Sequence, residues 1–551
     1  MTRDLPNDRK WFYVPIVVVC VAGMIWAMSL YAMSSRMGGG DYVYPSDDSY
    51  IHLALARNLA FHGVWSVNPD GFTPASSSPL WTVLLAVLFR IFGFHAAAPF
   101  FINLILMLLL LLILDDQFRK HQISAPTRIL LLLAVLVGAP LLVTVCLGME
   151  HVLHAILTIL VLNLGERLIA DDGDGLNTRS RVVMMALAAL LTATRYEGLA
   201  LIVPLSVLLV LRRRWGFATG LLLVSLVPPV LYALYATSQG GPPLPNTAYL
   251  KGVMDHPPDV FTGSIEDWVF WHGIQPIRMN SFMYTGVALG AFALIHYLRR
   301  GMAWSRAALT LMLTATMIIA HLIFSETNNL YRHEMYLHVL IFYVFGREMK
   351  VSVSSWFASL RSLPHSGQMG FAILLLLFLL FPAAHDLARR TWLTLRISEA
   401  MEDIRDQPLE TARLFREYFA GETVVIHDPG AVALDGNVRV IDLWGLASTD
   451  VMRLQQAGKL TSEAVDSLSR AGGASVAVLY DGWLNYRGGI PGNWVPIASL
   501  TLPDNIASAF PRVSIFATSA SAAPRVARAV QLFSLTLPEE VTLENAYLPE
   551  N

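Results

Sequence analysis

Long runs without a charged residue constrain the fold of this chain more than any other feature of its sequence. The first run covers residues 11–33 and is 23 residues long. Because about 20 apolar residues cross the hydrocarbon core of a bilayer, it predicts a membrane-spanning helix. The run is longer than the apolar core of a cleavable signal peptide and lacks an obvious cleavage site, so we expect it to remain in the protein.

The overall composition agrees with a membrane protein. Of the 551 residues, 55% are hydrophobic and only 15% are charged, whereas soluble domains are typically about 25% charged. A net charge of -2 argues against a nucleic-acid partner, whose phosphates would require a basic surface. Cys20 and Cys146 both lie in apolar runs, so no disulfide framework is predicted.

The number of spans depends on how the apolar run at 77–93 is placed. Further runs lie at roughly 96–114, 128–147, 150–168, 182–194, 198–211, 215–237, 283–298, 304–324, 330–346 and 369–385. If 77–93 crossed the membrane, the basic loops at 119–128 and 212–214 would face outside, against the positive-inside rule. We therefore expect 77–93 to be a juxtamembrane or re-entrant helix. About eleven spans then remain, and the N-terminus, with Arg3, Arg9 and Lys10, is cytoplasmic.

An odd number of spans places the C-terminal part of the chain outside the cytoplasm. Residues 398–420 have the pattern of an amphipathic helix, and short apolar runs follow at 423–427, 438–443, 475–480 and 513–517 with Gly and Pro between them. We therefore predict a mainly α-helical polytopic protein with a C-terminal extracytoplasmic α/β domain. The predicted boundaries are 1–386 for the transmembrane domain, whose first outer loop at 34–95 carries interfacial helices, and 387–551 for the α/β domain.

Two adjacent carboxylates, Asp47 and Asp48, follow the first span at the start of a helix that Gly63 would end. One explanation is helix capping, since a carboxylate at a helix N-terminus accepts backbone N–H groups. Capping needs only one of them, and two neighbouring carboxylates repel each other unless a proton, a cation or a basic substrate is present. The functional alternative is a general base, alone or together with a divalent-metal ligand.

Other ionisable residues fall on the same predicted outer side. Glu150, in LGMEHVLH, is either an interfacial carboxylate or a second acidic site residue or metal ligand. Arg195 and Glu197, in TATRYEGLA, lie between two short spans and are expected below the outer surface, in a cavity. Ionisable groups at such depth are costly and usually functional. The structural alternative is an ion pair between Arg195 and Glu197.

The remaining outer segments add basic and polar residues that suit a lipid phosphate. They occur in NNLYRHEMY, in GPPLPNTAYLKG and on the helix that follows Asp48. Each residue alone is more typical of an ordinary surface position, but the arginines and the lysine together predict a phosphate-binding cradle. The predicted donor-binding residues are Arg57, Arg195, Glu197, Asn246, Tyr249, Lys251, Arg332 and His333.

These motifs resemble a known class of enzyme. The stretch DDSYIHLALARNLAFHGVWSVNPDGFTPASSSPLWTVLLA looks like the first outer loop of GT-C-fold glycosyltransferases that use polyprenyl-phosphate sugars. The ordered series GMEH, TRYEGL, PNTAYLKG and YRHEMY, followed by VVIHDPGAVALDGNVRVIDLWGLAS, is most similar to the family of actinobacterial terminal arabinofuranosyltransferases. The resemblance covers most of the chain and rests on the order and placement of short motifs.

The resemblance implies an inverting membrane glycosyltransferase in the bacterial plasma membrane. Its active site would face outward, and its acceptor would be a cell-envelope glycan or glycolipid. An acidic residue of the first outer loop, Asp47 or Asp48, would act as the general base, with Asp47 favoured. Basic residues would hold the donor's phosphate, which leaves as polyprenyl phosphate. Glu150 and Asp48 would be tentative ligands of a divalent cation, Mg, Mn or Ca.

Two other functions compete with the enzyme. One is a transporter or flippase of lipid-linked glycans, which should carry polar groups through both leaflets, whereas here they gather at the predicted outer side. The other is a catalytically silent assembly protein whose C-terminal domain binds glycan or partners. Loss of sugar transfer on replacing Asp47 and Asp48 by Asn would favour the enzyme over both.

The predicted topology can be tested with a single cysteine at position 119. Arg119→Cys should be unreactive toward a membrane-impermeant thiol reagent in intact cells, because the loop after 96–114 is expected in the cytoplasm. Labelling of this cysteine would mean that 77–93 crosses the membrane.

Overall fold

The computed structural model describes residues 13–170, 178–250, 281–325, 330–361, 367–480, 482, 489–538 and 541–545, of which 349–361, 367–379 and 545 are described as backbone only. The chain forms two compact units. Unit 1 comprises residues 1–29, 100–229 and 257–395, and unit 2 comprises residues 30–99, 230–256 and 396–551. The predicted boundary at 386/387 falls inside a helix that ends at Leu395, and the first outer loop groups with the C-terminal domain.

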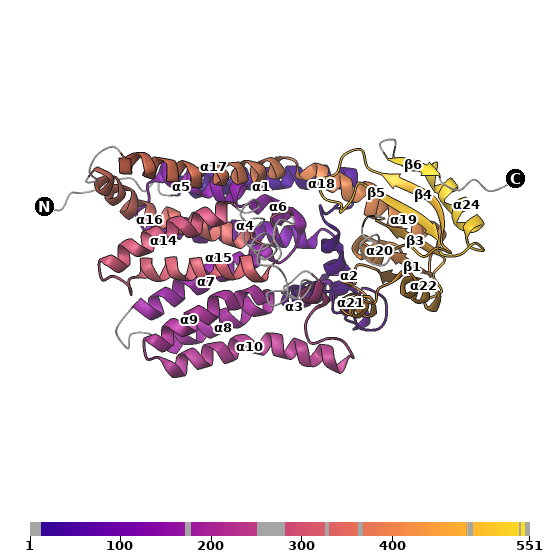
Figure 1. The fold of residues 1–551 in the computed structure, drawn as a ribbon, viewed down its shortest axis with the longest axis horizontal. Helices are drawn as coiled ribbons and strands as arrows, with labels where there is room; N and C mark the ends of the chain where they lie inside the picture. Colours follow the sequence, from indigo (N-terminus) through magenta and orange to yellow (C-terminus); the bar gives the residue numbers. More distant parts are fainter. Residues whose placement is uncertain are drawn as a thin grey trace. The chain divides into compact units, whose positions relative to one another are not determined.

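Unit 1 is built from long helices that run side by side (Figure 1). They are α1 (Val14–Met37), α4 (Ala98–Lys120), α5 (Ala125–Leu133), α6 (Leu141–Leu147), α7 (His151–Ala170), α8 (Thr178–Thr194), α9 (Leu199–Leu211), α10 (Trp215–Ser238), α14 (Ser281–Arg299), α15 (Arg306–Phe324), α16 (Met335–Arg361) and α17 (Gly367–Leu395). The ends of α1 and α10 belong to unit 2. A π-helical turn at Ala134–Gly138 joins α5 to the segment before α6.

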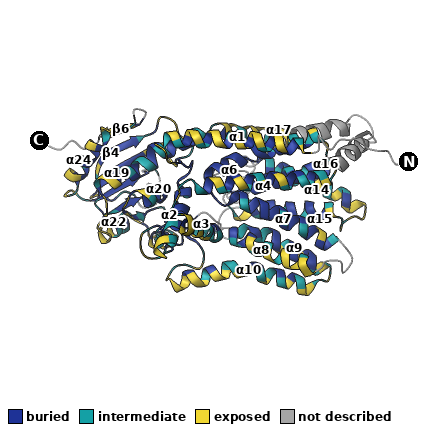
Figure 2. Ribbon diagram, turned by 180° about the vertical axis from the view of Figure 1, so that it is seen from behind, coloured by how far each residue is buried: buried dark blue, intermediate teal, exposed yellow. Residues whose placement is uncertain are grey.

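Several of these helices have the length and composition of membrane spans. Within the described residues, six pass this test, namely α1, α4, α7, α10, α14 and α15, and the pair α5–α6, bent by 44°, can count as a seventh. On α4, Ile105, Leu109 and Leu112 are exposed, as expected of a face that contacts lipid. Exposed positions also follow α10 along its length (Figure 2). The multi-pass helical architecture is confirmed, whereas a count of about eleven spans is not.

The C-terminal part of unit 2 contains a six-stranded mixed sheet. Its strands are β1 (Thr423–Ile426), β2 (Arg439–Asp442), β3 (Val476–Leu479), β4 (Val495–Thr501), β5 (Arg512–Ala517) and β6 (Thr542–Asn545), in the order β2-β1-β3-β5-β4-β6. β1 is parallel to both β2 and β3, and the remaining pairs are antiparallel. The four predicted apolar runs became β1, β2, β3 and β5, whereas β4 and β6 were not predicted.

Successive side chains along the strands pack into two different apolar cores. Val424 and Ile426 join the core that contains α19 (Glu410–Tyr418), α20 (Pro429–Asp435) and α24 (Ala523–Ser534). Val425 joins the other core, with α21 (Thr449–Gln456) and α22 (Ser462–Ala471). This period of two is what a strand covered on both faces requires. The predicted amphipathic helix at 398–420 is present as α18 (Ile397–Ile404), a π-helical turn and α19.

The apolar run at 77–93 forms the helix α3 (Pro79–Phe92), which belongs to unit 2. Its 14 residues reach about 21 Å at 1.5 Å per residue, short of a hydrocarbon core of about 30 Å. Trp81, Leu85 and Phe89 are buried against the protein, while Val83 and Val87 are exposed on another face. A short helix with two apolar faces agrees with the predicted juxtamembrane position.

The helix of the first outer loop, α2 (Asp47–His62), holds both ends of α20. At the start of α20, Asp47 Oδ2 accepts the N–H of Gly430 at 2.6 Å and Oδ1 accepts that of Ala431 at 2.7 Å. At its end, Arg57 Nη1 donates to the carbonyl of Leu434 at 2.5 Å. An anion at the N-terminus and a cation at the C-terminus both complement the helix dipole. Because each charge meets the matching end, the two helices run parallel.

Two further contacts join the segments around Asn68 and Asn246 to the C-terminal part of unit 2. Asn68 binds the edge strand β2, donating to the Val440 carbonyl at 3.2 Å and accepting its N–H at 2.9 Å. Asn246, the first residue of α11 (Asn246–Leu250), donates to the carbonyls of Gly445 and Leu446 at 3.0 and 3.1 Å. Ile51 and Leu55 of α2 lie in the same apolar core as β1. The first outer loop is therefore an integral part of the α/β domain.

The close packing of α2 on α20 should make Gly430 irreplaceable. A Cβ at this position would lie 2.1 Å from the backbone oxygen of Asp47, and overpacking of this kind costs about 1–3 kcal/mol. We expect Gly430→Ala to lower the thermal midpoint of the full chain in detergent by several degrees. Gly492→Ala is the matched control, because an added Cβ there meets nothing within 4 Å. Equal midpoints for the two variants would contradict the contact.

Candidate functional site

The buried polar residues of unit 1 gather around Arg195. This residue follows α8, and Glu150 precedes α7. Arg195 Nη1 donates to Glu150 Oε1 at 2.7 Å, and Nη2 donates to Glu197 Oε1 at 2.5 Å. The Arg195 Nη2 also lies 3.3 Å from His333 Nδ1. The predicted association of Glu150, Arg195, Glu197 and His333 is therefore present, and it includes the ion pair that was the structural alternative.

The turn that carries Arg332 and His333 has an unusual backbone. Leu330 and Tyr331, immediately before it, have φ angles of 51° and 54°. For residues with a Cβ, the left-handed region costs about 1–2 kcal/mol each, and such strain is found mainly at functional sites. Arg332 is 1% exposed, and its Nε lies 3.4 Å from His333 Nε2. This turn thus places a second arginine beside the Arg195 cluster.

Tyr336, on the first turn of α16, connects two histidines of neighbouring helices. Its hydroxyl lies 3.3 Å from His321 Nδ1, and its ring lies 4.4 Å from that of His154. All three side chains are at least 98% buried. His321 and Tyr336 were not predicted as site residues. The signal was present, because His321 is an ionisable residue inside the apolar run at 304–324.

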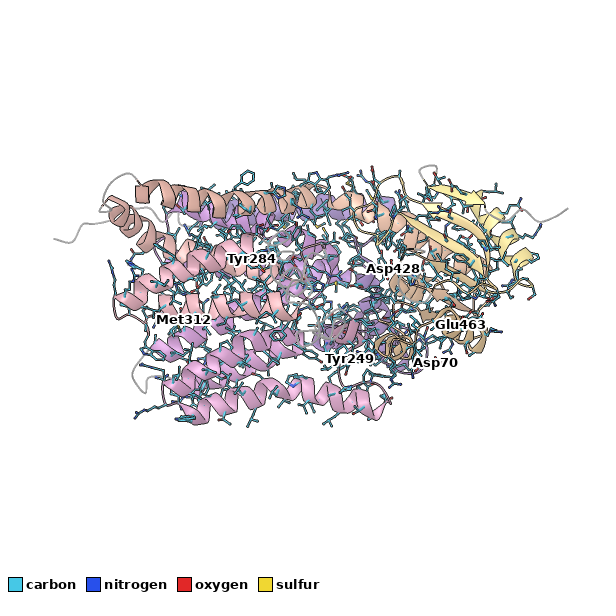
Figure 3. The ribbon with its side chains drawn as sticks, in the orientation of Figure 1. Asp70, Tyr249, Tyr284, Met312, Asp428 and Glu463 are labelled. Carbon is cyan, nitrogen blue, oxygen red and sulfur yellow. The ribbon has the colours of Figure 1, made fainter. Side chains whose placement is uncertain are left out.

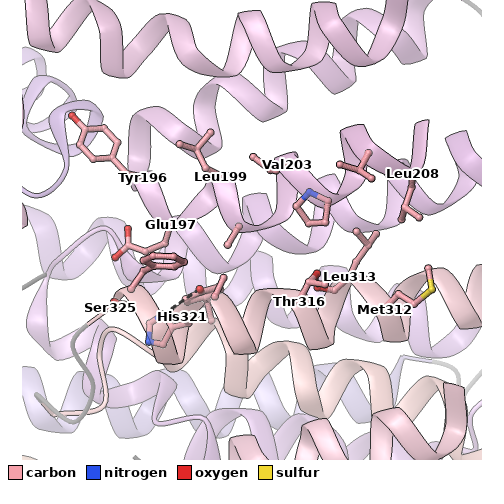
Figure 4. A pocket seen from close by; sticks show the side chains of 16 residues that line it. Tyr196, Glu197, Leu199, Val203, Leu208, Met312, Leu313, Thr316, His321 and Ser325 are labelled. Carbon is pink, nitrogen blue, oxygen red and sulfur yellow. Dashed lines mark hydrogen bonds between the residues drawn. The ribbon is translucent and has the colours of Figure 1, made fainter. Parts of the chain in front are cut away.

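A groove of about 720 Å³ runs along α9 and α15 next to these residues. Most of its lining is apolar, with Val203, Leu208 and Leu313 among the side chains. Polar groups are concentrated at one end, where Glu197 and His321 lie (Figure 4). The groove therefore has the polarity of an amphiphile, with an apolar channel and a polar head end.

A second buried network lies further along α7 and α16. Arg347 Nη1 donates to Glu166 Oε2 at 2.7 Å and its Nε lies 3.4 Å from Glu348, which accepts the Tyr297 hydroxyl at 2.9 Å. Glu166 follows Glu150 by 16 residues, about 24 Å along a helix. Buried polar groups therefore occur toward both ends of α7, in addition to those that the sequence placed at the outer side.

The predicted carboxylate pair lies in unit 2. Asp47 is 8% exposed and has both oxygens bound by backbone N–H groups of α20. Burial, and then the charge of Asp428, raise the pKa of Asp47 well above its usual value, although those N–H groups lower it. Asp48 is half-buried on the same turn of α2. Asp428 accepts the Tyr480 hydroxyl at 2.6 Å and is labelled in Figure 3.

The other predicted donor-binding residues differ in their surroundings. Arg57 donates to backbone carbonyls of α20, and Asn246 is fully buried against the 445–449 loop. Tyr249 packs against the apolar core of unit 2 and is also labelled in Figure 3. Lys251 lies outside the described residues. In unit 2, the described basic and amide candidates are thus engaged in holding the fold.

The two residues of the predicted cation site belong to different units. Glu150 belongs to unit 1 and Asp48 to unit 2, and Glu150 is bound to Arg195. Within the part of the chain that the structure describes, no group of three His, Cys, Asp or Glu side chains is arranged to hold a metal ion. A divalent cation held by Asp48 and Glu150 therefore stays a prediction.

Sequence comparison identifies only the C-terminal domain. Residues 398–519 match a family described as a domain of unknown function (DUF8728). No curated protein matches the sequence.

Solved structures match nearly the whole chain. ArnT from Cupriavidus metallidurans bound to undecaprenyl phosphate has a TM-score of 0.50 and 15% identity, covering 91% of this chain and 98% of that one. The apo form of the same protein has a TM-score of 0.49 and 15% identity, over 92% and 98%. The likeness to the first confirms the predicted fold, a polytopic GT-C protein with a C-terminal α/β domain. The finer resemblance to terminal arabinofuranosyltransferases stays a prediction.

Proposed function

We propose that this protein is an inverting membrane glycosyltransferase. It moves a sugar from a polyprenyl-phosphate donor to a cell-envelope glycan, glycolipid or similar acceptor at the outer face of the bacterial plasma membrane. The proposal rests on the groove between α9 and α15, whose apolar lining suits an isoprenoid chain and whose polar end suits its head group. The fold supports it, since the similar ArnT structure contains undecaprenyl phosphate.

The transfer requires a base for the acceptor hydroxyl, and we assign this role to Asp48. The sequence favoured Asp47, but both oxygens of Asp47 accept backbone N–H groups of α20. A base has to be within hydrogen-bond reach of the proton it removes, which requires a carboxylate that the acceptor can approach. Asp48 is half-buried on the same helix, which leaves Asp47 to hold α2 in position.

The displacement itself is a single step. The acceptor oxygen, losing its proton to the base, bonds to the anomeric carbon while the bond from that carbon to the phosphate oxygen breaks with its electron pair. Charge then develops on the departing phosphate, which the protein has to stabilise. Arg332, next to His333 in the unit 1 cluster, is our candidate for this contact. No step is assigned to a metal.

One observation favours a transporter of lipid-linked glycans as the second candidate. The Glu166–Arg347–Glu348 network places buried polar groups toward the far end of α7 as well, as a path across the membrane would need. The two functions separate in detergent. A glycosyltransferase forms product in micelles, whereas a transporter has activity only across a sealed bilayer.

The base assignment predicts a specific loss of transfer. In detergent, with a panel of polyprenyl-phosphate sugars, Asp48→Asn should reduce transfer on the order of 10²–10⁴-fold without changing the thermal midpoint. Asp70→Asn is the control, because Asp70 is an exposed acid of the same loop, paired with Arg439. Unchanged transfer by Asp48→Asn would eliminate this residue as the base.

Filling the groove should weaken use of long-chain donors. Ala320 lines the groove, whereas its neighbour Ile319 is 47% exposed and does not. Ala320→Trp should raise KM for a long polyprenyl donor by about tenfold, equivalent to about 1.4 kcal/mol, while Ile319→Trp stays near wild type. The measurement is initial-rate transfer as a function of donor concentration. Equal KM values in the two variants would mean that the chain binds elsewhere.

A further inference from the structure

Among the described residues that line the groove, none is a lysine or an arginine. Arg195, which pairs with the groove residue Glu197 at 2.5 Å, is also paired with Glu150 at 2.7 Å. Two carboxylates therefore offset one guanidinium. As the bond between the phosphate and the sugar breaks, the phosphate gains negative charge next to these carboxylates. Delivery of a proton would remove that charge.

His321 is placed to deliver such a proton. It lies in the last turn of α15 and lines the groove together with Glu197 (Figure 4). Its Nδ1 faces the Tyr336 hydroxyl at 3.3 Å, which fixes the ring. Its Nε2 is buried and makes no hydrogen bond within the described part of the chain.

His154 adds a second imidazole on the other side of Tyr336. The rings of His154 and Tyr336 are 4.4 Å apart, and His154 is 1% exposed. Neither of its ring nitrogens has a hydrogen-bond partner among the described residues. Buried polar atoms of this kind are rare in folded proteins and call for a water or a ligand. Of the two histidines, His321 lines the groove, and His154 packs behind it against Tyr336.

We propose that His321 Nε2 donates a proton to the phosphate of the departing polyprenyl phosphate, with Tyr336 as the residue that positions its ring. This role rests on the proposed glycosyl transfer. As the bond between the anomeric carbon and the phosphate oxygen breaks, the electron pair stays on the phosphate, which takes the proton from His321. The acceptor's hydroxyl proton goes to the carboxylate base. Water then removes one proton from the base and returns one to His321, so the reaction is balanced.

The test compares two donors whose leaving groups depend to different degrees on protonation as they depart. One is a natural polyprenyl-phosphate sugar, and the other has a difluoromethylene phosphonate leaving group, which is more acidic. His321→Gln should lower kcat on the order of 10²-fold with the natural donor and much less with the difluoro donor, with KM nearly unchanged. Tyr336→Phe should show the same pattern more weakly. Thr314→Val, a buried position of the same helix outside the groove lining, is the matched control.

The outcomes separate this role from the proposed function. Equal losses with both donors, or a raised KM at unchanged kcat, would show that His321 only binds, and the proposal fails while the transferase stands. No transfer by the wild type from any donor would overturn both. If His321→Gln has a lowered thermal midpoint, the same two donors are compared with Tyr336→Phe. A larger loss with the natural donor would support proton donation, because a merely structural role would not depend on the leaving group.

Discussion

A carboxylate on α2 and a guanidinium ten residues further along hold the two ends of α20, and unit 2 is organised around that contact. α20 follows β1, which lies between two parallel neighbours, β2 and β3. In open α/β sheets this position, at the carboxyl ends of the strands where the order reverses, is where ligands usually bind. Here the chain's own Asp47 occupies it. A position that could recognise a ligand is used to orient the first outer loop, and Asp48 is oriented with it.

Unit 1 depends on a different constraint, the cost of burying ions. Arg195 and Glu150 are nearly inaccessible, and breaking a buried pair by removing one partner typically costs about 3–5 kcal/mol. Such a network is maintained only if each member keeps its partners, so it fixes the ends of α7, α8 and α16 against one another. Because Arg195 is already paired with two carboxylates, its ability to bind a further anion is reduced. The groove beside it therefore relies on groups of another kind, the imidazoles and phenols.

The parts of the fold that sequence reasoning predicted are those encoded by local patterns. Uncharged runs predicted the spans, and short apolar runs predicted β1, β2, β3 and β5. β4, at Val495–Thr501, was missed because its sequence, VPIASLT, contains Pro and no clear alternation. The sequence named Glu150, Arg195, Glu197 and His333 among the candidate site residues, and the structure brings these four together.

Roles that depend on distant partners could not be predicted. Asp47 and Asp48 are equivalent in the sequence, and what distinguishes them is Gly430, 383 residues away. Arg57 was expected to bind phosphate, because a local pattern does not reveal that its guanidinium meets the carbonyls of α20. His321 stands alone in an apolar run, and only the packing of α15 on α16 gives it a partner in Tyr336.

The separation of Asp47 from Gly430 also has a consequence for how the protein is made. At roughly 5–20 residues per second, the ribosome needs about 20–80 s to reach Gly430 after Asp47. During that interval Ile51 and Leu55, which end in the core of unit 2, have no sheet to pack against. The segment that contains α2 therefore stays without its packing partners until the C-terminal part of the chain has been synthesised. Its structure is completed only when the last part of the chain arrives.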